Sequence, residues 1–316
     1  MPTPGAVLKS SAPGSLITCD GQVQWAGLLM GPGTPYQITA EGFTGWEDLP
    51  GLSSSDVPRP TAHGAWPGAR WAQPRIVTVT VWVLPPSGGA PADALAALLA
   101  ATAPTADGDD ERWLTVRLHD ESLACQARVT QRTVQVDRSY ARLGATRVAL
   151  QWVATDPRRF EPELLTEVGG LPEPERGLGW DLAWGQRDPA NPAWESLDWG
   201  VLPGSGDLVV RNEGSAPAQP VIEIVGPCVK PRLTVAATGA QLGYNISLKY
   251  GRRLVIDTAA GTVLLDGEED VRATALSGSL PENLFALQPG TTVLRFRADW
   301  GTGDAKVLVR RRNAHW

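Results

Sequence analysis

The 316-residue sequence contains few of the residues that build metal centres and covalent cross-links. The three cysteines are Cys19, Cys125 and Cys228, and the three histidines are His63, His119 and His315. No Cys-x-x-Cys pair occurs, and no histidine has a second histidine or cysteine at the spacing of zinc ligands. The sequence therefore predicts reduced, buried thiols in a protein made in the cytosol, with no metal site and no cofactor.

Long apolar runs and basic segments are also scarce. The most apolar stretch, residues 92–103, is too short to span a bilayer, so no membrane insertion is expected. The N-terminus lacks a basic start followed by an apolar core, and we expect synthesis without a signal peptide. A net charge of −6 argues against a nucleic-acid binder that neutralises phosphates. The one basic run, residues 310–312, is interpreted as a solvated terminal strand.

Motifs of common catalytic and nucleotide-binding sites are missing as well. The sequence has no G-x-S-x-G, no G-x-G-x-x-G and no G-x-x-x-x-G-K-[ST] segment. His119, Asp120 and Ser122 supply the residue types of a hydrolase triad, but neighbours in one hairpin turn cannot converge as a triad does. We therefore expect no catalytic residues and no enzymatic activity.

Tryptophan is in excess, with 13 residues against four Phe and four Tyr, and 34 Gly with 27 Pro indicate many turns. Residues 1–160 are predicted to form a β-domain with one helix. The alternating, β-branched segment 75–84 is typical of a strand buried on at least one side. Pro91 and Asp93 indicate the start of a helix near residues 91–102. Its predicted apolar stripe is Leu95, Leu98, Leu99 and Thr102.

The segment between Phe43 and Pro74 has no strand or helix periodicity. A structureless connection of this length is unusual inside a compact domain. Trp46, Trp66 and Trp71 argue against disorder, because disordered segments are poor in large aromatic residues. We interpret the segment as an extended arm that docks on a neighbouring subunit, and an arm folded back on its own domain is the alternative.

Residues 161–205 also lack periodicity and are rich in proline, glycine and tryptophan, which indicates a connector between domains. Its tryptophans are Trp180, Trp184, Trp194 and Trp199. Such residues anchor a connector or an interface through their large apolar area. The pairs Trp194-Glu195 and Asp198-Trp199 leave contact with a sugar open as an alternative.

Residues 206–316 contain short apolar strands separated by Gly, Pro and Asn turns, which is typical of a β-sandwich. The segment 294–300 alternates, which predicts that Leu294, Phe296, Ala298 and Trp300 all point inward. The second domain is therefore expected to be a sandwich with its own core.

The stretch "LVIDTAAGTVLLDGEED" (254–270) gathers five acidic residues around a glycine-bearing turn. A calcium-binding loop needs several carboxylates at fixed spacing between helices, whereas Asp257 is the one carboxylate that this turn supplies. We interpret the stretch as a hairpin in which Asp257 accepts hydrogen bonds from the turn and Gly261 takes a positive φ. A cation site is the alternative.

Several short motifs resemble one family when they are read in order along the chain. They are "ALQWVATDPRRF" (149–160), "PVIEIVGPCVKPRLTV" (220–235), "GRRLVIDTAAGTVLLDG" (251–267), "LFALQPGTTVLRFRADW" (284–300) and "VLVRRRNAHW" (307–316). Together they resemble the siphophage distal tail protein (Dit) family, a component of the phage tail and baseplate hub. The predicted connector and the arm look expanded relative to that family.

The resemblance implies a mainly-β chain: an N-terminal tail-tube-like β-sandwich or barrel with one helix, and a galectin-like C-terminal β-sandwich. It implies a structural protein of the virion tail tip, made in the host cytoplasm. The family forms a ring, usually hexameric, between the tail tube protein and the baseplate hub protein. The alternative function is a carbohydrate-binding module of a phage adsorption apparatus, because galectin-like sandwiches can bind glycans.

In such a ring each subunit meets its neighbour through two different patches. Tryptophan and arginine contribute most of the binding energy at protein interfaces. We therefore expect Trp46, Trp66, Arg70 and Trp71 of the arm to lie at the subunit interface.

Overall fold

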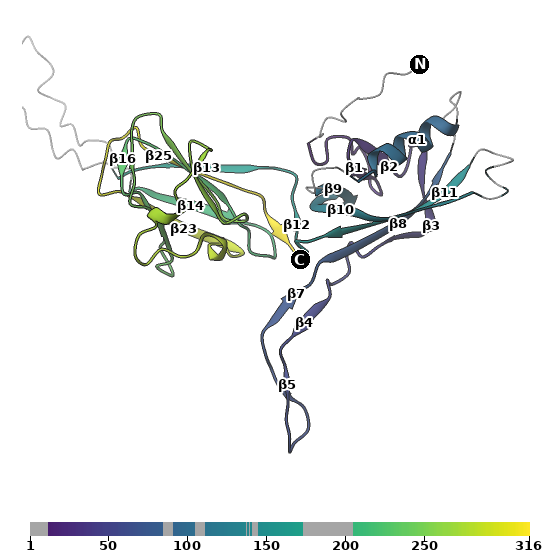
Figure 1. Cartoon of the computed structure of the whole chain (residues 1–316), viewed down its shortest axis with the longest axis horizontal. Helices are drawn as coiled ribbons and strands as arrows, with labels where there is room; N and C mark the ends of the chain where they lie inside the picture. The colour runs from purple at the N-terminus through teal and green to yellow at the C-terminus, as the bar shows by residue number, and fades with distance from the viewer. Residues whose placement is uncertain are drawn as a thin grey trace, which may run out of the picture. The chain divides into compact units, whose positions relative to one another are not determined.

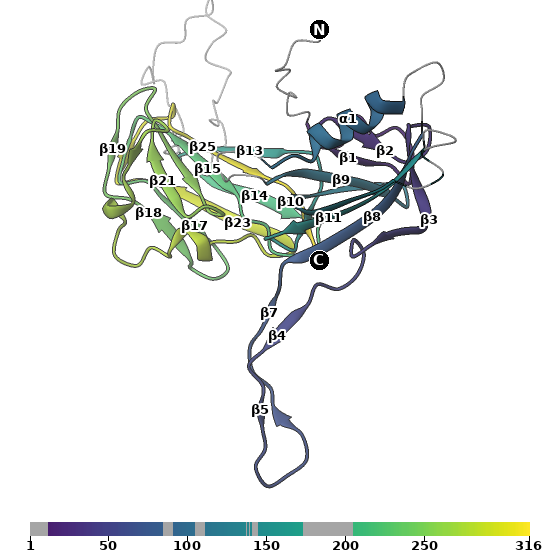
Figure 2. The same ribbon diagram turned by 45° about the vertical axis from the view of Figure 1, so that its right-hand side comes forward.

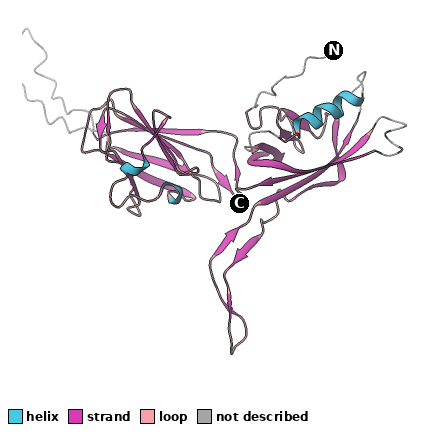
Figure 3. Cartoon of the chain, in the orientation of Figure 1, coloured by secondary structure: helices cyan, strands magenta, loops and turns pink. Residues whose placement is uncertain are grey.

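The computed structural model describes residues 12–84, 91–104, 111–136, 138, 140, 145–172 and 205–316. The chain divides into two compact units, and strands are the main regular secondary structure of each (Figures 1 and 3). Unit 1 comprises residues 1–163 and 314–316, and unit 2 comprises residues 164–313. The four tryptophans of the predicted connector lie outside the described residues.

Unit 1 is built on a nine-stranded sheet whose main path runs β2-β1-β9-β10-β11-β8-β3. The short strand β12 pairs with β10 and β26 beside this path. The strands are β1 (Val23–Trp25), β2 (Leu28–Met30), β3 (Tyr36–Thr44), β8 (Arg75–Val83), β9 (Arg112–Leu118), β10 (Glu121–Gln135), β11 (Thr146–Ala154), β12 (Arg159–Phe160) and β26 (Ala314–His315).

Strand β10 is long enough to join two halves of this sheet. Its first part pairs with β9, and its second part, from Arg128 onward, pairs with β11. The register shifts between Val129 and Gln131, and such a bulge bends a strand. Trp25 of β1 and Trp152 of β11 meet edge to face with ring centroids 5.9 Å apart. The bent sheet therefore encloses a core to which both halves contribute.

Helix α1 (Pro91–Ala101) is the helix expected near residues 91–102, and it packs on this core (Figure 1). Trp25 Nε1 donates a hydrogen bond to the carbonyl oxygen of Ala101 at 3.0 Å. The Tyr36 hydroxyl donates to the carbonyl oxygen of Ala94 at 2.8 Å. Two aromatic side chains of the sheet therefore fix both ends of the helix.

The buried face of α1 differs from the predicted stripe. The buried residues are Ala94, Leu98, Ala101 and Thr102. Leu95 and Leu99, which the periodicity places on the stripe, are only half-buried. The two carbonyl oxygens that the sheet aromatics bind belong to Ala94 and Ala101, and small residues there allow the helix to lie close to the sheet.

The last residues of the chain return to unit 1. Strand β26 pairs with β12 in the register Arg159↔His315 and Phe160↔Ala314. The chain therefore passes between the two units twice, once after Glu163 and once before Ala314. The sequence places residues 314–316 in the C-terminal domain, because nothing in their local pattern indicates a partner strand about 155 residues earlier.

Unit 2 contains sheets of six, four and three strands, with the orders β13-β25-β15-β20-β21-β22, β14-β23-β17-β18 and β19-β16-β24. Strand β13 lies within the stretch 161–205 that the sequence predicts as a connector, and it pairs along its length with β25. The elements are β13 (Leu165–Gly170), β14 (Asp207–Asn212), β15 (Val221–Val225), β16 (Cys228–Val229), β17 (Arg232–Val235), β18 (Gln241–Gly243), β19 (Ser247–Leu248), β20 (Arg253–Asp257), β21 (Thr262–Leu265), β22 (Glu269–Asp270), β23 (Gly290–Arg297), β24 (Trp300–Gly301), β25 (Lys306–Arg311), and the 3₁₀ helices η2 (Arg272–Thr274) and η3 (Glu282–Leu284).

Side chains from these sheets meet in one core. Leu294 and Phe296 of β23 are fully buried in it, as the alternation predicts. Trp300 is 58% exposed, so its predicted inward orientation is wrong. Strand β23 ends at Arg297, and Trp300 belongs to β24 in another sheet, so the alternation does not continue through the intervening turn.

The basic run 310–312 is not a solvated terminal strand. Arg311 is buried, and its Nη2 lies 2.8 Å from the carboxylate of Glu167 on β13. Arg310 forms an ion pair with Glu223 on the neighbouring strand β15. These arginines lie in the six-stranded sheet, where carboxylates of adjacent strands neutralise them.

The stretch 254–270 forms the hairpin β20–β21, as predicted. Asp257 Oδ1 accepts hydrogen bonds from the backbone N–H groups of Ala259 and Ala260, both at 2.9 Å. Gly261 adopts a φ of +67°, which glycine tolerates without strain. The capping carboxylate is therefore occupied by its own turn.

The three cysteines are free thiols, but they are not all buried. Burial raises the pKa of Cys125 to about 12 and that of Cys228 to about 11. Cys19 is exposed, which differs from the expectation of buried thiols. It precedes β1 in a loop whose backbone amides donate to the Gln22 side chain, so the strand does not include it.

Candidate functional site: a hairpin arm

Residues 51–73 form a long hairpin, here called the arm, that extends away from the sheet of its own unit (Figures 1 and 2). Its inner ladder pairs β4 (Leu52–Ser54) with β7 (Arg70–Ala72). Its outer ladder pairs β5 (Val57–Pro58) with β6 (Ala65–Trp66). The arm continues the β3–β8 hairpin beyond the edge of the sheet, since β8 begins at Arg75.

Between the two ladders the strands are not regularly paired, and a side-chain hydrogen bond connects them instead. Asp56 Oδ1 accepts a hydrogen bond from the N–H of Gly68 at 2.7 Å. This bond is the main reason that the pKa of Asp56 lies below its ordinary value. A Cβ atom on Gly68 would lie 2.3 Å from the carbonyl oxygen of Ser55, so the close approach of the strands requires glycine there.

The arm presents large apolar side chains to solvent. Trp66 is 52% exposed and Trp71 is 61% exposed. The other exposed large apolar residues of the arm are Leu52 and Val57, and Leu49 lies just before it. A two-stranded hairpin is at best marginally stable alone, so these side chains do not serve a core of the arm itself.

The structure places three of the four predicted interface residues on the arm surface. Trp66 lies opposite Val57 on the outer ladder, and the Arg59 guanidinium stacks 5.7 Å from the centre of its ring. Arg70 and Trp71 are exposed on β7. Because successive side chains of a strand alternate, these two point to opposite faces of the arm. The arm therefore offers contact groups on both faces.

Trp46 differs from the other three residues, since only 3% of its surface is exposed. Its ring packs on Phe43 at 5.9 Å between centroids, and the Arg159 guanidinium lies 5.8 Å from its centre. Trp46 is therefore part of the core of unit 1 and cannot offer its ring to a neighbouring subunit. A tryptophan in an aperiodic segment gives no sign of whether it is buried or exposed, so the sequence groups it with the others.

Residues 45–48, here called the root of the arm, are held by Arg75. The sequence patterns did not indicate a role for this arginine. Its side chain is 1% exposed. Its Nη1 donates to the carbonyl oxygens of Gly45, Trp46 and Asp48 at 3.0, 2.8 and 2.7 Å, and its Nε donates to that of Pro157 at 2.9 Å. Burial, and secondly the charge of Arg159, lowers the pKa of Arg75.

Four carbonyl oxygens thus offset the cost of burying the Arg75 guanidinium. The arm leaves the sheet from a rigid anchor rather than from a free loop. The position of Arg75 at the start of an apolar strand is the one feature of the sequence that could have indicated a buried arginine. Because arginine is usually a surface residue, this feature alone does not predict burial.

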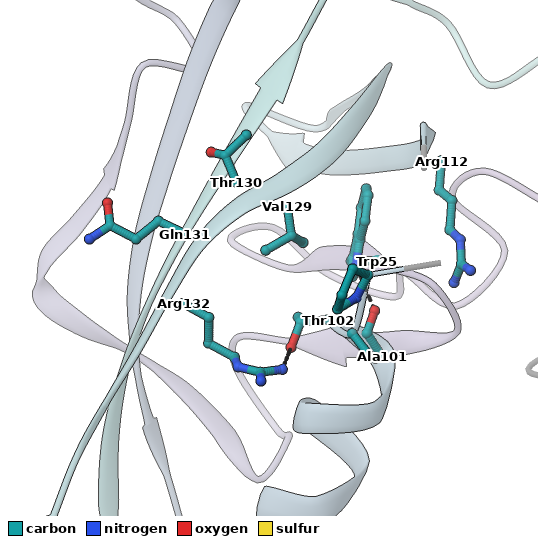
Figure 4. A pocket seen from close by; sticks show the side chains of 10 residues that line it. Trp25, Ala101, Thr102, Arg112, Val129, Thr130, Gln131 and Arg132 are labelled. Atoms are coloured by element: carbon teal, nitrogen blue, oxygen red, sulfur yellow. Dashed lines mark hydrogen bonds between the residues drawn. The ribbon is translucent and has the colours of Figure 1, made fainter. Parts of the chain in front are cut away.

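A surface pocket of about 280 Å³ lies between the end of α1 and the bulge of β10 (Figure 4). Arg132 Nη1 donates to Thr102 Oγ1 at 2.7 Å and to the carbonyl oxygen of Leu99 at 2.8 Å. Trp25 Nε1 is occupied by the helix carbonyl oxygen of Ala101. These polar groups are used to attach the end of the helix to the sheet. The pocket therefore marks the contact between helix and sheet.

No helix among the described residues has both the length and the apolar character needed to cross a membrane.

The comparisons with known proteins concern both units. Residues 213–309 match the family described as "siphovirus-type tail component, C-terminal domain". No curated protein matches the chain.

Among solved structures, the chain is similar to the SPP1 Dit protein (gp 19.1), described as a paradigm of the hub adsorption apparatus in phages that infect Gram-positive bacteria. The identity is 14%, the TM-score is 0.57, and the match covers 92% of this chain and 97% of the SPP1 chain. The phage P2 baseplate in its activated conformation with Ca matches at 8% identity and a TM-score of 0.48, over 92% and 97% of the two chains. A TM-score below 0.5 does not establish a shared fold, so the baseplate match does not support the fold assignment. That assignment depends on the match to the SPP1 protein.

The architecture and this match together confirm the predicted fold class, mainly β with a galectin-like C-terminal sandwich. The predicted resemblance to the siphophage distal tail protein family is confirmed as well: residues 213–309 match the siphovirus-type C-terminal domain, and the chain shares the fold of the SPP1 Dit protein.

Proposed function

We propose that the chain is a structural adaptor that assembles into a hexameric ring at the distal end of a phage tail tube. The ring joins the tail tube protein on one side to the baseplate hub protein on the other. The chain acts by assembly, not by catalysis. The observation that carries this proposal is the arm, a rigidly anchored hairpin whose exposed tryptophans have no core of their own to fill.

Contact with a neighbouring subunit would remove these side chains from water, whereas the isolated subunit leaves them exposed. A large apolar side chain contributes about 1.5–3 kcal/mol when it is fully buried. Trp66, Trp71, Leu52 and Val57 are the arm residues that would supply this contact. A heterologous contact of this kind, repeated around an axis, closes a ring and uses two different patches of each subunit.

The test is the assembly state of an armless variant. Gly51 and Gln73 are bridged by a backbone hydrogen bond, so Leu52–Ala72 can be replaced by an Asn-Gly turn that keeps the root and β8. Wild type is expected to show six-fold rings by electron microscopy, and the armless variant is expected to be a folded monomer by light scattering and circular dichroism. Rings from the armless variant would refute the role of the arm, and a wild type without rings would refute the ring itself.

Point variants refine this test. Trp66→Ala and Trp71→Ala should each shift the assembly equilibrium toward the monomer. Trp300→Ala is the matched control, since Trp300 is equally exposed but lies in unit 2. An equal loss of rings in all three variants would mean that the effect is not specific to the arm.

A carbohydrate-binding role of unit 2 is the second candidate, and two exposed aromatic residues favour it. Tyr250 is exposed next to β19, and Trp300 is exposed on β24 of the same three-stranded sheet. Exposed aromatic rings are the usual platforms for sugars. Glycan-array binding by the full chain that is lost in Trp300→Ala and Tyr250→Ala would support this role, and the absence of binding by the wild type would refute it.

A further inference from the structure

Three side chains of metal-ligand type converge in unit 1. Glu121 begins β10, Glu161 follows β12, and His315 lies on β26. One ligand atom from each lies within 4.8 Å of the other two. Glu161 Oε1 is 3.2 Å from His315 Nε2.

The sheet register explains why these residues meet. Ala124 of β10 pairs with Phe160 of β12, and Arg159 pairs with His315 of β26. Residues 159 and 161 face the same side of their strand, so the diagonal neighbours Glu161 and His315 share that side. The spacing of the histidines in the sequence predicts no metal site, because the three residues come together only through this strand pairing.

The ligand set has a definite chemical preference. Imidazole nitrogen and carboxylate oxygen bind Zn²⁺ at about 2.0–2.2 Å, which places adjacent ligand atoms of a tetrahedron about 3.3 Å apart. The contact between Glu161 and His315 already has this separation. The exposed Glu121 can close on the same ion by rotation of its side chain. A harder ion such as Ca²⁺ prefers oxygen ligands alone and more of them.

We propose that Glu121, Glu161 and His315 bind a divalent cation of the Zn²⁺ class and thereby fasten the C-terminal strand to unit 1. Three protein ligands leave a fourth position for water. The ion would relieve the repulsion between two carboxylates held close together. It would also link β26, which pairs with unit 1 over only two residues, to the turn that begins β10.

Arg159 is a charged group close to Glu121, and its guanidinium has partners other than the three proposed ligands. Its guanidinium stacks on Trp46, and its Nη2 donates to the carbonyl oxygen of Trp316. Through this hydrogen bond and its pairing with His315, Arg159 also holds residues 315 and 316 in place. Arg159 therefore positions the strand on which the proposed ligand His315 lies.

The chain supplies a matched control. His119 Nε2 lies 3.3 Å from Glu47 Oε1, which reproduces the histidine–glutamate pair with no second carboxylate in the cluster. His63 on the arm is a further exposed histidine. Both can be replaced without touching the proposed site.

The experiment is calorimetric titration of the untagged full chain with ZnCl₂. One ion per chain is expected to bind, and His315→Gln and Glu121→Gln should each weaken binding about 10-fold or more. His119→Gln and His63→Gln should bind as the wild type does, and CaCl₂ should give no comparable binding. Circular dichroism without metal verifies that the variants fold.

Hydrogen exchange provides a second readout of the proposed link. The amides of Ala314 and His315 should exchange more slowly in the wild type when Zn²⁺ is added, with no such change in Glu121→Gln. Absence of Zn²⁺ binding by the wild type, or full retention of binding in both His315→Gln and Glu121→Gln, would overturn the proposal.

Discussion

The arm and the β20–β21 hairpin of unit 2 are both antiparallel ribbons closed by a turn, but they differ in what surrounds them. In unit 2, β20 also pairs with β15, and β21 also pairs with β22. Leu254, Ile256 and Val263 of that hairpin are fully buried. The arm has no further strand on either side among the described residues, and its tryptophans are exposed.

Under the proposed function, the same local pairing serves two purposes. A hairpin inside a sandwich contributes to the stability of its own unit, because a sheet and a core cover its apolar face. A hairpin that leaves the sheet keeps its apolar surface for another molecule. Substitutions in the two hairpins should therefore separate folding from assembly.

The largest expected difference lies between Ile256→Ala and Trp71→Ala. Removing the fully buried Ile256 side chain should lower the free energy of unfolding by about 2–5 kcal/mol. Removing the exposed Trp71 ring should change it by less than about 0.5 kcal/mol. Urea denaturation of dissociated subunits measures both. A large loss of stability in Trp71→Ala would mean that the arm packs on its own chain.

The next effect concerns the arm root. Arg75→Met should lower the free energy of unfolding by roughly 3 kcal/mol, because it leaves several buried carbonyl oxygens without a donor. Arg59→Met is the matched control on the outer part of the arm, where the side chain only stacks on Trp66, and it should leave thermal unfolding unchanged. Equal effects in the two variants would contradict a rigid root.

The smallest effects concern two aspartates that accept backbone hydrogen bonds, Asp257 within its turn and Asp56 across the two strands of the arm. Asp257→Ala should cost about 1 kcal/mol, because two turn amides lose their acceptor inside a cooperative unit. Asp56→Ala should loosen only the arm, with no change in global unfolding. Hydrogen exchange of the amides of Ala259 and Gly68 reports each hydrogen bond separately. Slow exchange at Gly68 in Asp56→Ala would contradict the role of this carboxylate.

The same carboxylate gives the arm a pH dependence. The pKa of Asp56 lies below its ordinary value of 3.8, mainly through the hydrogen bond from Gly68. A lowered pKa means that the bond stabilises the arm at pH values above the ordinary pKa, and that this stabilisation is lost as the pH falls through the lower folded-state pKa. The amide chemical shift of Gly68, followed by NMR on acidification, should move below pH 3.8 and stay constant at neutral pH.

Much of the fold is readable from the sequence where burial follows local periodicity. The alternation of residues 75–84 predicts β8, and the apolar face found there is Val77, Val79, Val81 and Val83. The turn at His119-Asp120 joins β9 to β10, and both residues have positive φ, which suits a tight hairpin. The Asp257 cap follows from the turn chemistry of aspartate.

The candidate site is readable only in part, because exposure depends on contacts distant in the sequence. Trp46, Trp66 and Trp71 lie in one aperiodic segment, and only Trp46 is buried, because Phe43 and Arg159 cover its ring. Arg311 looks like a solvated residue until Glu167 on β13 is placed beside it.

By itself, the sequence determined the strands with a clear alternation, such as β8, the helix α1, the turn chemistry and the presence of an unusual tryptophan-bearing segment, because these depend on neighbouring residues and on the preferred angles of the backbone. The tertiary structure alone decided which tryptophans face solvent, that Arg75 anchors the arm, and that Glu121, Glu161 and His315 meet. The physical reason is that burial, ion pairing and ligand geometry are set by strand register between distant segments, and no local pattern encodes that register.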